Sequence, residues 1–288
     1  MHPRDDIREF LTSRRARITP GQAGLPAYGA TRRVPGLRRE EVAMLAGISV
    51  EYYTRLERGT AQGASEDVLE GIARALQLDE AERAHLFDLV RAANAARPAV
   101  RRPSQERVRP TVLRILDAIT APAYVRNGRL DVLAANQLGE ALYSPVFAST
   151  AGIPNVARFI FLHPEATAFF VGWEGVASDA VAILRAEAGR DPYDRRLSDL
   201  IGELSTRSEE FRVRWAAHDV KFHRTGAKLL HHPVVGELSL SYEAMELPGD
   251  AGQRINVYTA EPGSPSEYAL RLLASWSASQ PVEASEQR

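Results

Sequence analysis

The chain has 288 residues, a formal net charge of −1 and 44% hydrophobic residues, which is enough sequence for two ordinary globular domains. It contains no cysteine, which excludes disulfide bonds, thiolate metal sites and cysteine nucleophiles. No apolar run reaches the length of a membrane span, and residues 1–10 lack the apolar core of a signal peptide. We therefore expect a cytoplasmic protein with no membrane partner.

Charge is distributed unevenly along the chain. Residues 1–58 hold 11 arginines and seven acidic residues, whereas residues 110–288 hold 17 basic and 22 acidic residues. A positive N-terminal part that precedes a negative body is typical of a protein that places one end on nucleic acid.

The first predicted helix covers residues 6–15 and has one apolar face and several arginines near its end. Residues 18–36 follow, and their seven glycines and prolines predict an irregular link. Arg32 and Arg33 lie in this link. They either contact DNA phosphate or the minor groove, or they are solvated loop charges, and the sequence leaves both interpretations open.

Residues 37–59, LRREEVAMLAGISVEYYTRLERG, predict two short helices around a tight turn. Gly47 can adopt the left-handed backbone that ends a helix, and Ser49 is a predicted N-cap. Tyr53 and Leu56 are expected to face inward from the second helix. The apolar face of the first helix is predicted to contain Val42, Ala43, Leu45 and Ala46. This is the layout of a helix-turn-helix, whose second helix enters the DNA major groove.

The alternative interpretation is an αα-hairpin that only packs on another element. The Gly-Ile-Ser turn and the arginines outside the apolar face favour DNA binding instead. The turn and the closing Leu-Glu-Arg-Gly at residues 56–59 resemble the helix-turn-helix of Cro/phage-repressor-like (XRE) bacterial regulators. Arg39 stands where that family usually has a glutamine that grips a phosphate, and an arginine can make the same contact.

We expect Glu51, Tyr52 and Arg55 to read bases, with Val50 in apolar contact and arginines on the phosphates. The predicted DNA-binding residues are Arg32, Arg33, Arg38, Arg39, Ser49, Val50, Glu51, Tyr52, Arg55 and Arg58. Because one helix-turn-helix covers few base pairs, the protein is expected to bind a double-stranded DNA operator as a homodimer.

Two further helices are predicted to begin at Ser65 and at Asp79, where Asp79 and Glu82 form a capping-box pattern. Residues 1–96 are thus predicted to be an all-α domain of five helices. Residues 97–110, RPAVRRPSQERVRP, hold three prolines and five arginines and predict an exposed linker.

Residues 111–280 mix helices and strands. Residues 123–135 predict a β-hairpin with Asn127-Gly128 as a two-residue turn. Further strands are predicted at residues 220–225, 237–243 and 255–259. Helices are predicted at residues 112–119, 137–142, 173–188 and 266–276, and around Leu197 and Phe211. Together these elements predict an α+β domain built on an antiparallel sheet with flanking helices.

Several short motifs in this half of the chain are informative. They are Leu133-Ala134-Ala135-Asn136, Trp173, Leu184-Arg185-Ala186-Glu187, Gly189-Arg190-Asp191-Pro192, Ser208-Glu209-Glu210-Phe211, Trp215, His218-Asp219-Val220, His232-Pro233 and Gly236-Glu237-Leu238. These motifs resemble the MmyB-like ligand-binding domain, a PAS-like module found behind such a helix-turn-helix in actinobacterial regulators. The chain departs from that pattern at Gly172 and Tyr193, where the family commonly has acidic residues. The resemblance implies a small hydrophobic or amphipathic ligand, such as a fatty-acid-like one.

The aromatic residues of this half either build the core or line an apolar ligand site. The resemblance is what favours a ligand site. The predicted ligand-binding residues are Tyr124, Phe159, Phe169, Phe170, Trp173, Trp215, Tyr242 and Tyr258.

Other chemistry has little support in the sequence. The histidines at positions 218, 223, 231 and 232 lack the spacing of a zinc site, and the adjacent pair at 231 and 232 is expected to point to opposite sides. No Gly-x-Ser-x-Gly elbow and no phosphate-binding glycine loop is present. We therefore predict no catalytic residue, no metal site and no cofactor.

The sequence predicts a sequence-specific transcription regulator that senses a small ligand. One alternative is a DNA-binding regulator whose C-terminal half is a protein-interaction or dimerisation module without a ligand. Another is a DNA-targeted enzyme. A closed apolar cavity would favour sensing, and an exposed aromatic patch would favour protein contact.

Overall fold

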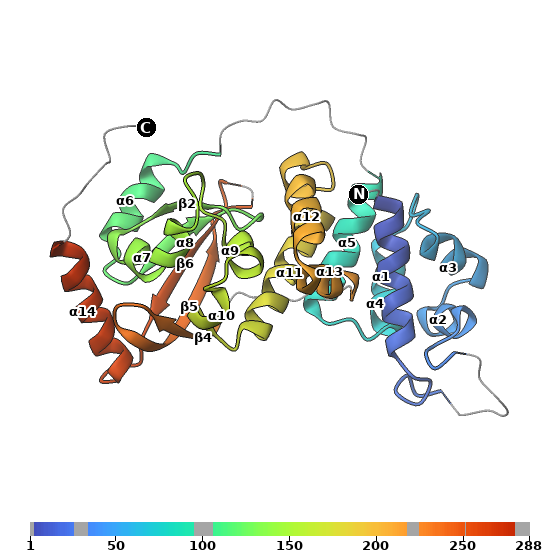
Figure 1. Cartoon of the computed structure of the whole chain (residues 1–288). Helices are drawn as coiled ribbons and strands as arrows, with labels where there is room; N and C mark the ends of the chain where they lie inside the picture. The colour runs from blue at the N-terminus through green and yellow to red at the C-terminus, as the bar shows by residue number, and fades with distance from the viewer. Residues whose placement is uncertain (1–2, 26–33, 95–105, 218–224, 251, 280–288) are drawn as a thin grey trace. The chain divides into compact units, whose positions relative to one another are not determined.

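The computed structural model describes residues 3–25, 34–94, 106–217, 225–250 and 252–279 (Figure 1). The chain forms two compact units. The first unit contains Met1–Arg102, Val181–Gly202 and Arg212–Phe222, and the second contains Pro103–Ala180, Glu203–Phe211 and His223–Arg288. The division into a DNA-binding domain, a linker and a ligand-binding domain stays a prediction.

The first unit begins with the five predicted helices. They are α1 (Pro3–Arg17), α2 (Arg39–Ala46), α3 (Val50–Glu57), α4 (Glu66–Ala75) and α5 (Glu80–Asn94). Their apolar faces meet in one core, whose largest side chains include Ile7, Phe10, Leu11, Tyr53, Leu56, Ile72 and Leu86. The helix α1 begins three residues before the predicted start. The predicted inward position of Leu45 is wrong, because its side chain is 37% exposed.

The tight turn between α2 and α3 is as predicted. Gly47 has a φ of 70°, in the left-handed region, and the N–H of Ile48 donates to the Ala43 carbonyl at 3.0 Å. The hydroxyl of Ser49 accepts from the backbone N–H of Tyr52 at 3.1 Å, so Ser49 is the N-cap of α3. Two local signals therefore fix the angle at which α3 leaves α2.

The second unit is built on a six-stranded antiparallel sheet in the order β2-β1-β6-β5-β4-β3. The strands are β1 (Ala123–Arg126), β2 (Val132–Ala135), β3 (Phe170–Val171), β4 (Thr225–His232), β5 (Gly236–Glu246) and β6 (Arg254–Thr259). The predicted strand at residues 220–225 falls mostly outside the described residues, and β4 begins at its last position. The alternating burial along β5 confirms a half-buried strand.

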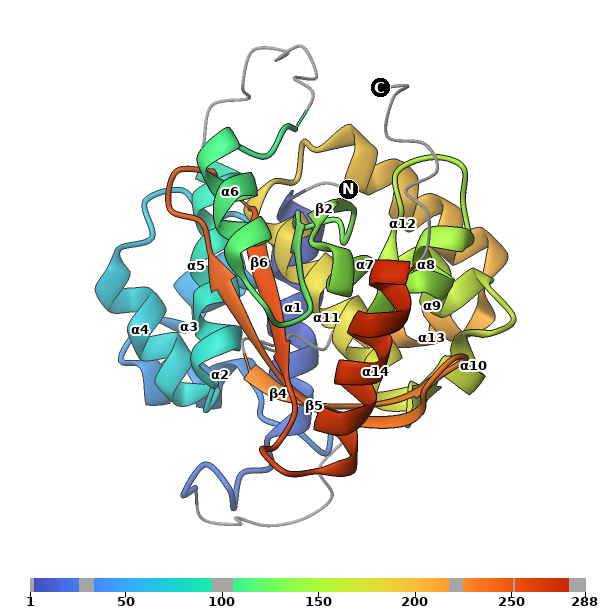
Figure 2. The same ribbon diagram turned by 90° about the vertical axis from the view of Figure 1, so that its left-hand side faces the viewer.

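The helices of the second unit lie around this sheet. They are α6 (Pro110–Ala118), α7 (Gln137–Leu142), α8 (Ser144–Ala148), α9 (Val156–Leu162), α10 (Ala166–Phe169) and α14 (Pro265–Ser279). The closing helix α14 packs against β5 and α7 (Figure 2). The short helices α8, α9 and α10 and the strand β3 were not predicted.

Three helices contribute residues to both units. They are α11 (Trp173–Arg190), α12 (Arg195–Arg207) and α13 (Glu209–Ala216). Residues 173–180 of α11 belong to the second unit, and residues 181–190 belong to the first. None of the helices in the described part of the chain is long and apolar enough to cross a membrane.

The β1–β2 hairpin is confirmed, but its predicted two-residue turn at Asn127-Gly128 is wrong. The backbone N–H of Asn127 donates to the Asp131 carbonyl at 3.1 Å, which makes a longer connection. Leu130 lies inside that connection with a φ of 65°, a left-handed conformation that few non-glycine residues adopt.

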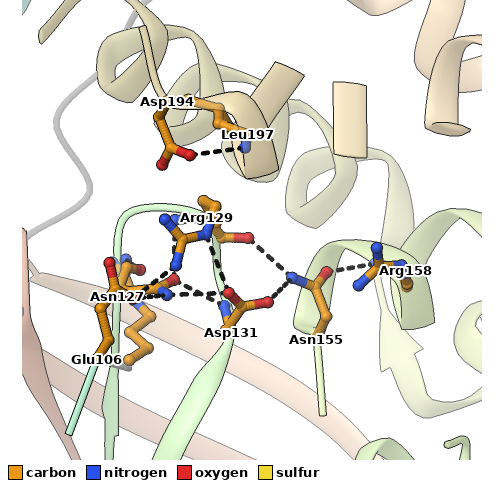
Figure 3. Close-up of polar contacts among 9 residues, drawn as sticks. Glu106, Asn127, Arg129, Asp131, Asn155, Arg158, Asp194 and Leu197 are labelled. Atoms are coloured by element: carbon orange, nitrogen blue, oxygen red, sulfur yellow. Dashed lines mark hydrogen bonds and ion pairs between the residues drawn. The ribbon is translucent and has the colours of Figure 1, made fainter. Parts of the chain in front are cut away.

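A polar network that is mostly buried, apart from Glu106, holds this unusual connection in place (Figure 3). One carboxylate oxygen of Glu106 accepts from Asn127 and from Arg129, both at 2.6 Å. Asp131 accepts from the same two side chains at 2.9 and 3.1 Å, and its second oxygen accepts from Asn155 at 2.7 Å. The network depends on residues distant in sequence, so the local Asn-Gly signal could not predict it.

Candidate functional site

The front of α3 is open to solvent, as the sequence predicts. Val50 is 41% exposed, and Glu51 and Arg55 are also exposed, whereas Tyr53 and Leu56 are fully buried. The helix therefore presents one polar face and anchors itself by the other. An outward face of this kind at the N-terminal half of the second helix is what base reading requires.

Arg55 and Tyr52 form a single surface on that face. The guanidinium carbon of Arg55 lies 5.1 Å from the centre of the Tyr52 ring, so the arginine stacks on the aromatic side chain. A stacked guanidinium loses fewer conformations when it binds, because the ring already limits them. Its fork of N–H donors suits the two acceptors of guanine.

Glu57 at the end of α3 is the centre of a buried ion-pair network. Its side chain is 1% exposed. One oxygen accepts from the Thr12 hydroxyl at 3.1 Å and from the Nε and Nη2 atoms of Arg15 at 3.0 and 2.8 Å. The other oxygen accepts from Nε of Arg39. One carboxylate thus joins α1, α2 and α3.

This network determines how Arg39 can act. Its Nε atom is bound to Glu57, but the side chain is still 47% exposed. Because Glu57 holds the Nε atom, the terminal nitrogens of the Arg39 guanidinium can adopt fewer positions than those of a free arginine side chain. That arrangement suits the predicted phosphate contact, which itself stays a prediction.

The remaining predicted DNA-binding residues differ in what the structure shows. Arg38 and Arg58 are exposed at the ends of α2 and α3, and Arg38 makes a 3.3 Å ion pair with Glu40. Arg32 and Arg33 lie outside the described residues. Ser49 is exposed and uses its hydroxyl as the helix cap.

In the second unit, seven buried aromatic residues form one connected set, which we call the aromatic cluster. They are Tyr124, Tyr143, Phe159, Phe169, Phe170, Tyr242 and Tyr258. Neighbouring ring centres are 4.9–6.1 Å apart. Six of these residues are predicted ligand-binding residues. Tyr143, which connects the tyrosines to the phenylalanines through Phe169, was missed because no periodic pattern surrounds it.

Three tyrosine hydroxyls converge inside the aromatic cluster. The Tyr258 hydroxyl lies 2.7 Å from that of Tyr143 and 3.2 Å from that of Tyr124. Burial and the neighbouring tyrosines raise the pKa of Tyr258 and Tyr143 well above the usual value of 10.0, so these two hydroxyls stay protonated. Three hydroxyls supply three donor hydrogens, and the two contacts between them use only two.

Lys228 on β4 lies beside the aromatic cluster. Its ammonium nitrogen is 5.5 Å from the centres of both the Phe170 and the Tyr242 rings. Burial lowers the pKa of Lys228 from 10.5 to about 8, and the charge of Asp179 opposes this shift. Lys228 is one of two lysines in the sequence, and its side chain is partly buried on the sheet.

The two predicted tryptophans are not part of the aromatic cluster. The Trp173 indole donates to the Ile160 carbonyl at 2.9 Å, and its ring contacts Phe161 at 6.1 Å. Trp215 belongs to the first unit, where its ring lies under the guanidinium of Arg185 at 4.2 Å. The eight predicted ligand-binding residues are therefore not brought together as one set.

The histidines do not form a metal site in the part of the chain that is described. No group of three or more potential ligands occurs there. His232 is buried and its Nε2 atom lies 2.9 Å from the Ala141 carbonyl, whereas His231 is exposed on the opposite face of β4. Burial lowers the pKa of His232, so it is neutral at pH 7. His218 and His223 lie outside the described residues.

Two family models match the chain. The MmyB-like transcription regulator ligand binding domain matches residues 108–273, and a helix-turn-helix domain matches residues 8–86. No curated protein matches the chain. The first match includes the aromatic cluster and Lys228, and the second includes α2, α3 and the Glu57 network. The two matched ranges agree with the two resemblances that the sequence motifs carry.

Replacing Glu57 by Gln should destabilise the helix-turn-helix by about 3–5 kcal/mol, because the mostly buried Arg15 loses its counter-charge. The measurement is denaturant unfolding of the full chain together with amide hydrogen exchange of α1 and α3. Glu51→Gln is the matched control on the exposed face of α3, and it should change stability by less than about 0.5 kcal/mol. Equal exchange rates in the two variants would contradict the proposed role of Glu57.

Lys228 should titrate near pH 8 in the folded protein. A Lys221→Arg variant leaves Lys228 as the only lysine, so an isotope-labelled dimethyl-lysine signal can be followed by NMR against pH. Because the unfolded chain binds the proton more tightly than the folded one, the penalty of Lys228 is present below pH 8 and disappears as pH rises toward 10.5. Lys228→Met should therefore raise stability more at pH 7 than at pH 10. A titration at the ordinary pKa of lysine would contradict the buried position.

Proposed function

Because the chain belongs to the family of the MmyB-like transcription regulator ligand binding domain and also carries a helix-turn-helix domain, we propose that it regulates transcription by binding a specific DNA operator and sensing a small amphipathic molecule. The observation that carries the proposal is the open face of α3 in a matched helix-turn-helix. Such a regulator acts in the cytoplasm, where the bacterial chromosome is.

Base reading is assigned to Glu51, Tyr52 and Arg55, with Val50 in apolar contact. All four lie on the face of α3 that the core does not use. Positioning on the phosphates is assigned to Arg39, with Arg38 and Arg58 at the neighbouring helix ends. Since phosphate contacts carry no sequence information, the specificity of this site rests on α3.

Ligand sensing is assigned to the aromatic cluster. Its phenylalanines offer apolar contact, while the remaining tyrosine hydrogen and the Lys228 amine offer polar contact. A molecule with one apolar part and one hydrogen-bond acceptor would satisfy both. Control of DNA binding then requires that the ligand prefer one conformation of the protein over another.

Dimerisation is part of this proposal, and one exposed surface favours it. Tyr268, Leu272 and Trp276 repeat every four residues on α14, and they are 65%, 50% and 37% exposed. A stripe of this kind on one helix is available for protein contact. The same stripe is what the alternative interpretation, an interaction module without a ligand, would use.

Arg55→Ala should weaken binding to operator fragments obtained by in vitro selection by about 1–3 kcal/mol and relax the preference at one base position. Arg207→Ala is the control, since Arg207 is an exposed arginine of α12 in the second unit with a local ion pair to Glu203. Fluorescence anisotropy on the selected fragment and on single-base variants measures both effects. Unchanged discrimination in Arg55→Ala would remove this residue from the reading set, and failure to select any sequence would overturn the proposed function.

Native mass spectrometry of the freshly purified chain should show a homodimer that carries an additional small-molecule mass. Tyr258→Phe removes a hydroxyl from the centre of the aromatic cluster, so it should reduce the fraction of protein with that mass by tenfold or so, the loss of about one hydrogen bond. Trp215→Phe changes an aromatic residue of the first unit and should leave the fraction unchanged. A monomer without any added mass would argue against both sensing and dimerisation.

A further inference from the structure

Part of the matched ligand-binding region packs inside the helical unit that contains the helix-turn-helix. The family match covers residues 108–273, but Val181–Gly202 and Arg212–Phe222 belong to the first unit. We call residues 181–202 and 212–217 the docking segment. The contacts with α1 and α5 described below all lie within the first unit, and the segment itself lies outside the range 8–86 that matches the helix-turn-helix domain.

The closest approach is between α11 and α5. Gly189 has no side chain, and a Cβ atom at this position would lie 2.5 Å from Cε1 and 2.7 Å from Nδ1 of His85. The His85 ring is 6% exposed and contacts the Phe10 ring edge-on at 5.1 Å, so it has little room to move aside. Only glycine allows α11 to pass this close to α5.

Apolar packing continues this contact. Ala186 of α11 packs against the same core that contains Tyr53 and Leu56 of the helix-turn-helix. Ala186 and Gly189 are small residues on one side of the helix, which lets the backbone of α11 approach the core. The docking segment is therefore an added layer of the helix-turn-helix core rather than a surface attachment.

Charges are complementary across the same contact. Arg185 is 6% exposed, and its guanidinium is held by the Trp215 ring and by the Trp215 carbonyl. Burial raises the pKa of Asp6 on α1 from 3.8 to about 6, and the charge of Arg185 is among those that lower it, so the two groups attract each other. Burial likewise raises the pKa of Asp88 on α5, and the charge of Arg190 is among those that lower it.

The C-terminal end of α1 also contacts the docking segment. Nη2 of Arg17 donates to the Ala217 carbonyl at 2.8 Å. The docking segment thus interacts with α1 near both of its ends, at Asp6 and at Arg17, while Glu51 and Arg55 of α3 stay exposed. The docking segment therefore does not cover the reading face, and any effect on DNA binding must pass through α1 and α5.

We propose that helices α1 and α5 form an internal docking surface for the docking segment, and that this contact couples the ligand-binding region to the helix-turn-helix. This inference rests on the proposed function for its consequence at DNA. The helix α11 is the element suited to the coupling, because residues 173–180 belong to the second unit and residues 181–190 to the first. A shift of α11 would act on α1, and α1 is joined to α3 through Glu57.

A pair of glycine substitutions on α11 tests the contact in the full-length protein. Gly189→Ala should raise amide hydrogen exchange in α1 and α5 by at least tenfold, because its methyl group displaces His85. Gly175→Ala is the matched control, since nothing lies within 4 Å of a Cβ at that position, and alanine there favours the helix. Equal exchange in the two variants would overturn the docking surface.

A rescue experiment separates the contact from a general loss of folding. His85→Ala removes the atoms that the new methyl group would meet, so Gly189→Ala should have much less effect in that background than in the wild type. If the two substitutions simply added, the contact between these positions would be refuted. This test does not involve DNA, so it is independent of the proposed function.

The coupling is tested by measuring the dissociation constant of the same variants for the selected operator fragment. Gly189→Ala should change the dissociation constant by at least fivefold, and Gly175→Ala should leave it within twofold of the wild type. Raised exchange with an unchanged dissociation constant would overturn the coupling. If no operator fragment can be selected while the exchange results hold, the proposed function fails and the docking surface stands.

Discussion

The buried carboxylate of Glu57 is the interaction on which the DNA-binding half depends. It is the last residue of α3, yet it binds side chains of α1 and α2, so the recognition helix is held by charge at one end and by Tyr53 and Leu56 along its inner face. A buried charge of this kind is stable only with all of its partners present. The network therefore fixes the end of α3 relative to α1 and α2.

The core of the second unit depends on buried aromatic residues instead of an ion-pair network. It buries four tyrosines whose hydroxyls need partners, and the hydroxyls of Tyr124 and Tyr143 both contact that of Tyr258. A cationic side chain, Lys228, lies against the rings at the edge of this group. Polar groups inside an apolar set cost stability unless they are satisfied, which gives a physical reason for these hydroxyls to lie together.

Local signals explain which parts of the fold could be predicted from sequence. Gly47 and Ser49 each act within four residues, and the helix-turn-helix followed from them. The two-residue turn at Asn127-Gly128 was wrong because Glu106 and Asn155, distant in sequence, stabilise a longer connection. Tyr143 and the separation of Trp215 from the other aromatics were missed for the same reason. Such contacts depend on which helices meet in space, and residue spacing does not contain that information.

The close fit between Gly189 and His85 limits how modular this architecture is. Helix-turn-helix domains are commonly regarded as interchangeable modules. In this chain the unit that contains the helix-turn-helix also includes a segment that begins more than 80 residues after the end of α5. An exchange of residues 1–102 alone would therefore place another side chain against position 189 unless it kept His85. Any residue at position 85 has to fit the space beside Gly189, so this pair limits where the chain can be divided for a domain exchange.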